Sequence, residues 1–311
     1  MSLLPLFVDS EYEVRSGWKF AAYSSVLVLL FYAAGIAFGT FAIWLDPALI
    51  LMSHDDIRFL ALNAAVLFVP AAGALLVMTR FVEHVPISAF GVLLHRGWLR
   101  DFGNGLLLAA GMIAVVLVGT VPFGSIHVEW IASAAALPAV GGTLVVLLVS
   151  ALNEELVFRG YPFQIFLKGL GPSGAMLLIS FVWALLHLRN DGATLLSTIN
   201  TVIAGVFFCR AYMETRSLWL PYGIHVGWNV GTAMVLGIPV SGIDTASLMR
   251  TQMTGPSLIV GANYGPENSI LGTIVFLAGA IVIRRMHIGR VSPEAQAALN
   301  ENAAKVYIEK P

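Results

Sequence analysis

Long apolar runs dominate this sequence and limit the folds that it can adopt. A membrane-spanning helix needs about 20 mainly apolar residues, because the hydrocarbon layer is about 30 Å thick. The first such run extends from Trp18 to Trp44. The predicted spans are residues 18–44, 58–79, 102–122, 139–167, 173–188, 193–213, 217–238 and 268–286. The predicted fold is therefore all-α, a polytopic membrane bundle of about eight transmembrane helices.

Composition supports a membrane protein and excludes some functions. Of the 311 residues 58% are hydrophobic and 11% are charged, whereas soluble domains carry about 25% charged residues. The net charge of −1 gives no indication of a nucleic-acid partner. The single cysteine, Cys209, excludes an intramolecular disulfide and a multi-cysteine metal site. We interpret Cys209 as a small helix-packing residue. The composition as a whole predicts an integral protein surrounded by the lipid bilayer.

Lysine and arginine positions predict the orientation. With eight spans both termini share one side, which receives 14 of the 17 lysines and arginines, against 3 on the other side. Positively charged residues concentrate in cytoplasmic loops. We therefore expect both termini in the cytoplasm and the protein in the plasma membrane of a prokaryote.

The fourth span carries an unusual group of charges. A charged side chain in the middle of the membrane costs roughly 2.5–3.5 kcal/mol, so Glu154, Glu155 and Arg159 are candidates for function. Glu155 and Arg159 are four residues apart and can pair on one helix face. Glu154 points about 100° away from that face, which leaves it without a partner on its own helix and suits a general base. The alternative is a buried ion network that only holds helices together.

Two histidines and an asparagine in later spans complete the candidate site. His187 ends one apolar run, and His225 and Asn229 lie four residues apart in another. At 1.5 Å per residue, Glu154 and His187 both lie about 21–22 Å from the cytoplasmic surface, and His225 and Asn229 about 12 and 18 Å. We therefore expect these groups to converge below the membrane surface.

These residues resemble the motifs of the CPBP family (CAAX protease and bacteriocin-processing), which includes the Ras-converting-type CAAX prenyl endopeptidases. The resemblance covers about residues 140–232. Its three motifs are Glu-Glu-x-x-x-Arg at Glu154, Glu155 and Arg159, Phe-x-x-x-His at His187, and His-x-x-x-Asn at His225 and Asn229. Trp183 stands where the second motif has phenylalanine.

The resemblance implies intramembrane proteolysis. Glu154 and His187 would activate a water molecule, and His225 and Asn229 would stabilise the oxyanion. Glu155 and Arg159 would position Glu154 or the substrate. The substrate would be a membrane-anchored peptide or protein, for which a prenylated CAAX protein is the family precedent.

The sequence leaves the cofactor open. Catalytic zinc commonly has three protein ligands and a water, and Glu154, His187 and His225 are the candidates here. A metal-free, glutamate-activated water would use the same residues.

Two other functions and a division of the chain complete the predictions. The chain could be a non-catalytic immunity or scaffold protein, or a proton-coupled transporter, although it shows no internal repeat of the transporter kind.

The predicted regions are a cytoplasmic segment (1–16), N-terminal transmembrane helices (17–135), a catalytic helical core (136–240), an exposed loop with the last transmembrane helix (241–290), and a cytoplasmic tail (291–311).

Overall fold

The computed structural model describes residues 4–8, 13–47, 57–286 and 288–297. Parts of the two predicted cytoplasmic segments, residues 1–3, 9–12 and 298–311, lie outside the described residues. The described residues form a helix bundle with two short strands, so the predicted all-α class is confirmed.

The bundle is built from helices of very different length. The α-helices are α1 (Leu4–Phe7), α2 (Ser16–Leu45), α3 (Ile57–Val77), α4 (Trp98–Thr120), α5 (Leu137–Glu155), α6 (Tyr161–His187), α7 (Leu195–Thr215), α8 (Trp219–Asn229), α9 (Ser257–Val260) and α10 (Ile270–Met286). Three π-helical turns, η2 (Met78–Val82), η4 (Leu156–Gly160) and η5 (Val230–Val235), extend α3, α5 and α8. The 3-10 turns are η3 (Ile87–Phe90), η6 (Ala262–Tyr264) and η7 (Pro266–Asn268), and the strands are β1 (Ile126–Trp130) and β2 (Met249–Met253).

All eight predicted spans fall on helical segments. Among the described residues, five stretches are long and apolar enough to cross a membrane, and one of them, Leu137–His187, has 51 residues. It is two spans, because Gly171 has non-helical angles (φ 69°, ψ 176°) directly before Pro172. Glycine tolerates this backbone conformation, and proline cannot donate the hydrogen bond that would continue the helix. The predicted spans 139–167 and 173–188 lie on either side of this break.

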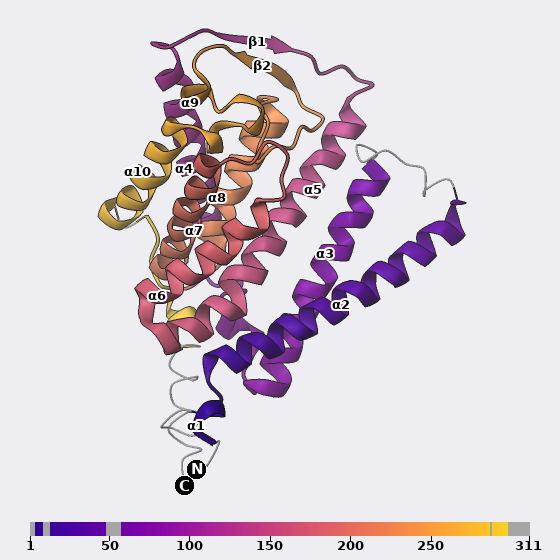
Figure 1. The fold of residues 1–311 in the computed structure, drawn as a ribbon, viewed down its shortest axis with the longest axis vertical. Coiled ribbons are helices and arrows are strands. Elements are labelled where there is room, and N and C mark those ends of the chain that lie inside the picture. The colour runs from indigo at the N-terminus through magenta and orange to yellow at the C-terminus, as the bar shows by residue number, and fades with distance from the viewer. Residues whose placement is uncertain (1–3, 9–12, 48–56, 287, 298–311) are drawn as a thin grey trace.

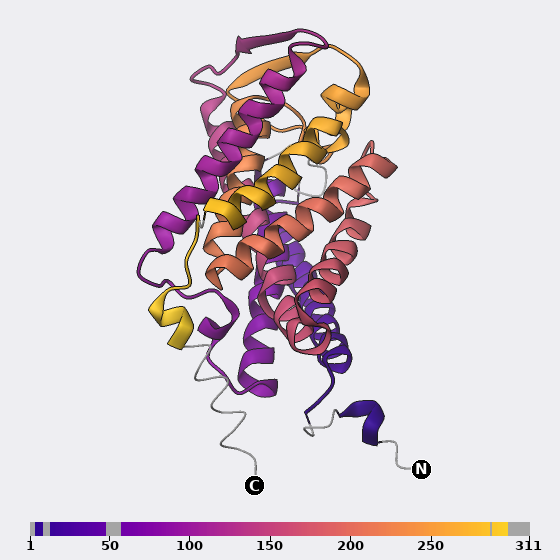
Figure 2. The same ribbon diagram turned by 90° about the vertical axis from the view of Figure 1, so that its left-hand side faces the viewer.

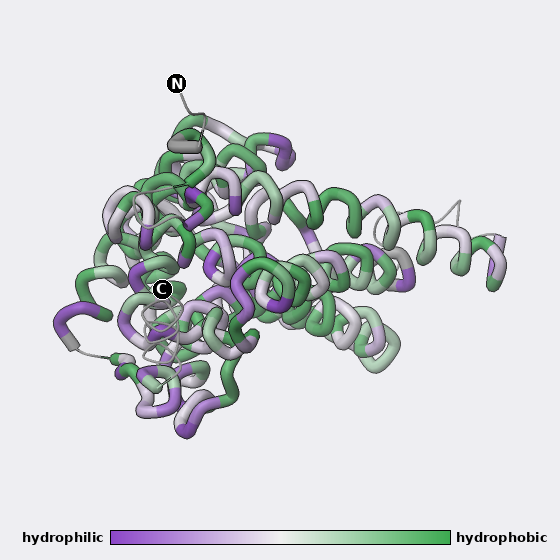
Figure 3. Tube along the Cα trace, turned by 90° about the horizontal axis from the view of Figure 1, so that it is seen from below, coloured by the Kyte–Doolittle hydropathy of each residue, from purple (hydrophilic) through white to green (hydrophobic). Residues whose placement is uncertain are grey.

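The bundle has two distinct ends. The first and last described segments, α1 and residues 291–297, lie at one end, here called the termini end, and β1, β2 and α9 lie at the other, here called the loop end (Figure 1 and Figure 2). Figure 2 shows the same two ends after a quarter turn. Seen from the termini end, α2 and α3 project to one side and are largely hydrophobic (Figure 3). Apolar side chains of α2 are exposed, among them Leu29 at 70% and Ile36 at 68%, as expected for a lipid-facing helix.

The segment 241–267 corrects one prediction, because it is only partly an exposed connection. Its strand β2 pairs antiparallel with β1, from Ile126 opposite Met253 to Trp130 opposite Met249. Tyr264 and Glu267 are buried, and Asn200 of α7 donates to the Glu267 carbonyl oxygen at 2.8 Å. Buried backbone groups need hydrogen-bond partners, and strand pairing and Asn200 provide them here.

Small residues bring α8 against α4. A Cβ atom added to Gly223 would lie 2.2 Å from the carbonyl oxygen of Phe102, and one added to Gly105 would lie 2.6 Å from the amide nitrogen of Ile224. Glycines at such positions let two helix backbones approach closely in a membrane. The contact fixes α8, which carries His225 and Asn229.

Candidate active site

A cavity of about 1600 Å³ inside the bundle collects the predicted site residues. Glu154, His187, His225 and Asn229 all line it. They come from α5, α6 and α8, and α2 and α3 form the opposite wall. The expected convergence of these four residues is therefore confirmed.

Glu154 lies in the last turn of α5 and takes its partner from another helix. Its Oε2 atom accepts a hydrogen bond of 2.7 Å from Nε1 of Trp183 on α6. Trp183 lies one turn before His187, so the bond places Glu154 and His187 at similar depth, as the helix arithmetic predicts. Glu154 also interacts electrostatically with His225 and His187. Its side chain is only half-buried, and so it remains accessible from the cavity.

His187 is the last residue of α6, and its ring is fixed in one orientation. Nδ1 lies 2.9 Å from the carbonyl oxygen of Trp183, and the two rings meet edge to face with centroids 4.8 Å apart. A carbonyl oxygen can only accept, so Nδ1 carries the hydrogen. In the neutral ring Nε2 is then the acceptor.

Glu155, Arg159 and His225 form a fully buried cluster. Glu155 Oε1 lies 3.3 Å from Arg159 NH1 and 2.9 Å from Nδ1 of His225. The predicted Glu155–Arg159 pair is thus confirmed. Glu155, however, contacts His225 and not Glu154, because the two adjacent carboxylates point to different sides of α5.

Aromatic rings enclose the Arg159 guanidinium. Its Cζ atom lies 4.6 Å from the ring centre of Trp183 and 5.1 Å from that of Phe208. Phe208 also stacks on His225, with ring centroids 5.0 Å apart. A planar guanidinium suits this combination of ring stacking and carboxylate pairing better than a lysine does. The arginine therefore ties the position of Trp183 to that of His225.

Four asparagines line the cavity, and two of them, Asn153 and Asn229, lie next to the other site residues. Asn229 ends α8, one turn after His225. Asn153 precedes Glu154, and its buried Oδ1 has no hydrogen-bond partner among the described residues. Both are suited to contact a bound peptide, and sequence reasoning identified only Asn229.

Sequence reasoning also missed Glu267, a carboxyl group in the cavity wall. Oε1 accepts from Trp228 Nε1 at 2.7 Å, and Oε2 accepts from the Ser241 amide at 3.2 Å. Burial raises the pKa of Glu267, while the bonds from Trp228 and Ser241 act in the opposite direction. The only sequence signal for this residue is a carboxyl group directly before the last apolar run.

The described residues show no ready-made set of three metal ligands. No group of three His, Cys, Asp or Glu side chains within the described ranges is placed to hold a metal ion. The histidine contacts are compatible with metal binding, since metal-bound histidines usually donate their other N–H to a carboxylate or carbonyl. Glu154, His187 and His225 do not form such a group among the described residues, and the zinc prediction stays a prediction.

The comparison with known proteins agrees with the motifs. Residues 136–231 match the sequence model of the family described as type II CAAX prenyl endopeptidase Rce1-like, which confirms the resemblance over this region. An isoleucine–tRNA ligase from Psychrobacter arcticus is 32% identical over 117 residues, which are 37% of this chain and 11% of that protein. The chain therefore spans about a ninth of that relative's length. No solved structure matches the chain.

Proposed function

We propose that this integral membrane protein is a CAAX-type intramembrane endopeptidase, which hydrolyses a peptide bond of a membrane-associated substrate with a water activated by Glu154. One observation carries the proposal. A carboxylate, two histidines with oriented rings and an asparagine line a single cavity inside an apolar bundle. The family match over the same residues supports this reading.

The proposed reaction begins at Glu154. Its carboxylate takes a proton from a water molecule that also donates a hydrogen bond to His187 Nε2, and the water oxygen attacks the carbonyl carbon of the substrate. His225 and Asn229 donate hydrogen bonds to the resulting oxyanion. When the C–N bond breaks, Glu154 returns its proton to the leaving amine, and the other product is a carboxylic acid.

The contacts of His225 set a condition on its charge. Nδ1 donates to Glu155, so Nε2 can donate to an oxyanion only if the ring is an imidazolium. Glu155 provides the compensating negative charge at 2.9 Å. In this state Glu155 and Glu154 are negative and Arg159 and His225 are positive, so the four charges sum to zero. An oxyanion donor of this kind is commonly worth about 2.7–4 kcal/mol.

A comparison of membrane-protein termini tests the proposal. Cells expressing the wild type, Glu154→Gln or Glu129→Gln at equal levels are compared by mass spectrometry. Glu129 is an exposed carboxyl residue on β1 that is not among the residues lining the cavity. We expect shifted termini with the wild type and with Glu129→Gln, and none with Glu154→Gln. If the membrane-protein termini are identical in all three strains, the proposed peptidase activity is refuted and a non-catalytic protein is favoured.

A further inference from the structure

We infer that Glu267 is a positioning residue, which holds the last turn of α8 so that His225 and Asn229 face the cavity. Glu267 lies outside the matched range 136–231, in the 3-10 turn η7 that precedes α10. The inference rests on the proposed function, because it assigns Glu267 a part in forming the oxyanion side of the proposed active site.

The face of α8 that carries the site residues is turned away from α4. Gly223 and Gly227 bring the helix against α4, and each lies two residues before a site residue, His225 or Asn229. Two residues correspond to about 200° around a helix. The contact with α4 therefore supports the back of α8 and leaves the site face to the cavity, which His225 and Asn229 line.

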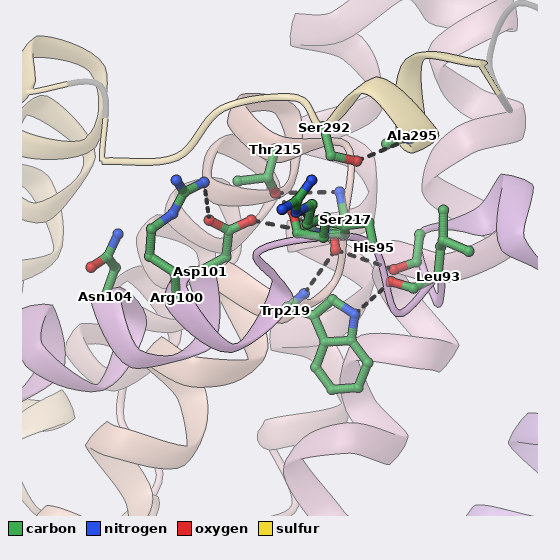
Figure 4. A network of polar contacts seen from close by, with 12 residues as sticks. Leu93, His95, Arg100, Asp101, Asn104, Thr215, Ser217, Trp219, Ser292 and Ala295 are labelled. Carbon is green, nitrogen blue, oxygen red and sulfur yellow. Dashed lines mark hydrogen bonds and ion pairs between the residues drawn. The ribbon is translucent and has the colours of Figure 1, made fainter.

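A polar network fixes the start of α8, as Figure 4 shows. Trp219, the first residue of the helix, donates from Nε1 to the Leu93 carbonyl oxygen at 2.8 Å. Its amide donates to Ser217 Oγ at 3.3 Å. These contacts lie more than a helix turn before His225, so they hold the end of α8 that is remote from the site.

Trp228 fixes the other end of α8 from the side. It lies directly before Asn229 and points about 100° away from it around the helix. Its Nε1 atom donates to Glu267 Oε1 at 2.7 Å, and its ring packs against Phe276 of α10, with ring centroids 5.1 Å apart. Trp228 and Glu267 are both buried, and a buried N–H group is rarely left without an acceptor. The bond therefore opposes rotation of the last turn of α8.

Glu267 itself is anchored to two other helices. Asn200 of α7 donates from Nδ2 to the carbonyl oxygens of Glu267 and Ser269, at 2.8 and 2.9 Å. Thr273 of α10 donates to Asn200 Oδ1 at 2.7 Å. A side chain positions its neighbour well only when its own place is fixed by further hydrogen bonds, and α7 and α10 provide them for Glu267.

The carboxyl group of Glu267 also connects the two halves of the site. Its Oε2 atom accepts from the Ser241 amide at 3.2 Å, and the Ser241 carbonyl oxygen accepts from Asn190 Nδ2 at 3.0 Å. The amide of Asn190 donates to the His187 carbonyl oxygen at 3.1 Å. A chain of hydrogen bonds thus connects the turn after His187, which would hold the water, with the helix end at Trp228.

Cysteine labelling of the purified protein in detergent tests the positioning without a substrate. The single cysteine, Cys209, is fully buried and gives a quiet background. Asn229→Cys and Ser150→Cys each place a thiol in the cavity wall, on α8 and on α5, for reaction with a small charged methanethiosulfonate. Glu267→Gln replaces one acceptor oxygen by an amide group that cannot accept. We expect it to change the labelling rate of Asn229→Cys severalfold and to leave that of Ser150→Cys as it was.

Two outcomes of the labelling would overturn the inference. One is an unchanged rate at position 229. The other is an equal change at positions 150 and 229, because Glu267 would then only stabilise the bundle as a whole. Glu129→Gln, on the exposed strand β1, is the matched control and should change neither rate.

Cleavage kinetics provide the second measurement, with a peptide that spans a Glu154-dependent cleavage site. We expect Glu267→Gln and Trp228→Phe each to lower kcat about 10- to 100-fold with KM nearly unchanged, because a misplacement of about 1 Å can slow a reaction about 100-fold. The double variant should be no slower than the slower single variant, since each change breaks the same chain of contacts. A raised KM with an unchanged kcat, or losses that multiply in the double variant, would overturn the inference.

The two measurements separate the inference from the proposed function. If no terminus depends on Glu154 while labelling at position 229 responds to Glu267→Gln, then the peptidase fails and the positioning of α8 stands. If cleavage depends on Glu154 and the kcat of Glu267→Gln equals that of the wild type, then the peptidase stands and the inference fails.

Discussion

Replacing Glu155 by glutamine should destabilise the protein and also slow cleavage. The Glu155 side chain is fully buried, and its Oε1 contacts both Arg159 and His225. Glutamine retains an oxygen that accepts one hydrogen bond, but it removes the negative charge. Arg159, which is also fully buried, then keeps a positive charge whose carboxylate partner is gone. Removing one partner of a buried ion pair costs about 3–5 kcal/mol.

Thermal unfolding in detergent measures the first effect. One kcal/mol corresponds to about 2–4 °C for a domain of 150–250 residues, so we expect the midpoint of Glu155→Gln to fall by about 10 °C. Cleavage should fall as well. Without Glu155 the imidazolium form of His225 loses its counter-charge, and loss of an oxyanion donor commonly slows a reaction about 100- to 1000-fold.

Glu154→Gln is the matched control, since it changes the neighbouring residue in the same way. Glu154 is half-buried, and its Oε2 bond to Trp183 survives through the glutamine oxygen. We expect lost cleavage with an unfolding midpoint close to that of the wild type. Equal midpoints for the two variants would refute the assignment of Glu155 to a buried structural cluster and of Glu154 to the chemistry.

Three further predictions concern the surroundings of the site. Trp183→Phe removes the hydrogen bond to Glu154, and a bond to a charged acceptor is worth about 1.5–3 kcal/mol. Cleavage should therefore slow about 10- to 100-fold. An unchanged cleavage rate would show that the bond does not position Glu154. Gly223→Ala places a Cβ atom 2.2 Å from the Phe102 oxygen and should lower the unfolding midpoint by several degrees, whereas Gly141→Ala, with open space around it, should not. A metal chelator should leave cleavage by the purified protein unchanged, and a loss that zinc restores would establish a metal enzyme.

Much of the fold follows from the apolar pattern, because a helix in hydrocarbon satisfies its own backbone hydrogen bonds. Gly171 and Pro172 divide the longest helical stretch where the sequence predicts two spans. The β1–β2 pair was not predictable in the same way. Its register joins residues 126–130 to residues 249–253, and no short-range pattern specifies pairing across more than 100 residues.

The candidate site was predictable as a set of residues but not as a set of contacts. Helix arithmetic predicted Glu154 and His187 at one depth, and Glu154 bonds to Trp183, one helix turn before His187. The rotation of each helix about its axis is set by packing, such as the approach of Gly223 to α4. For that reason the contact of Glu155 with His225, and the presence of Glu267 in the cavity wall, emerge only from the structure.

The two adjacent carboxylates have different surroundings because of helix geometry. Successive residues of a helix point about 100° apart, so the neighbour of a fully buried Glu155 must face another direction. On α5 that direction is the cavity. The pair at Glu155 and Arg159 compensates charge inside the bundle. Glu154 accepts a hydrogen bond from the N–H group of Trp183, and its half-buried carboxylate faces the cavity. In the proposed reaction two consecutive glutamates thus serve as a structural anion and a reactive one, which requires that one face of the helix is packed and the adjoining face lines a cavity.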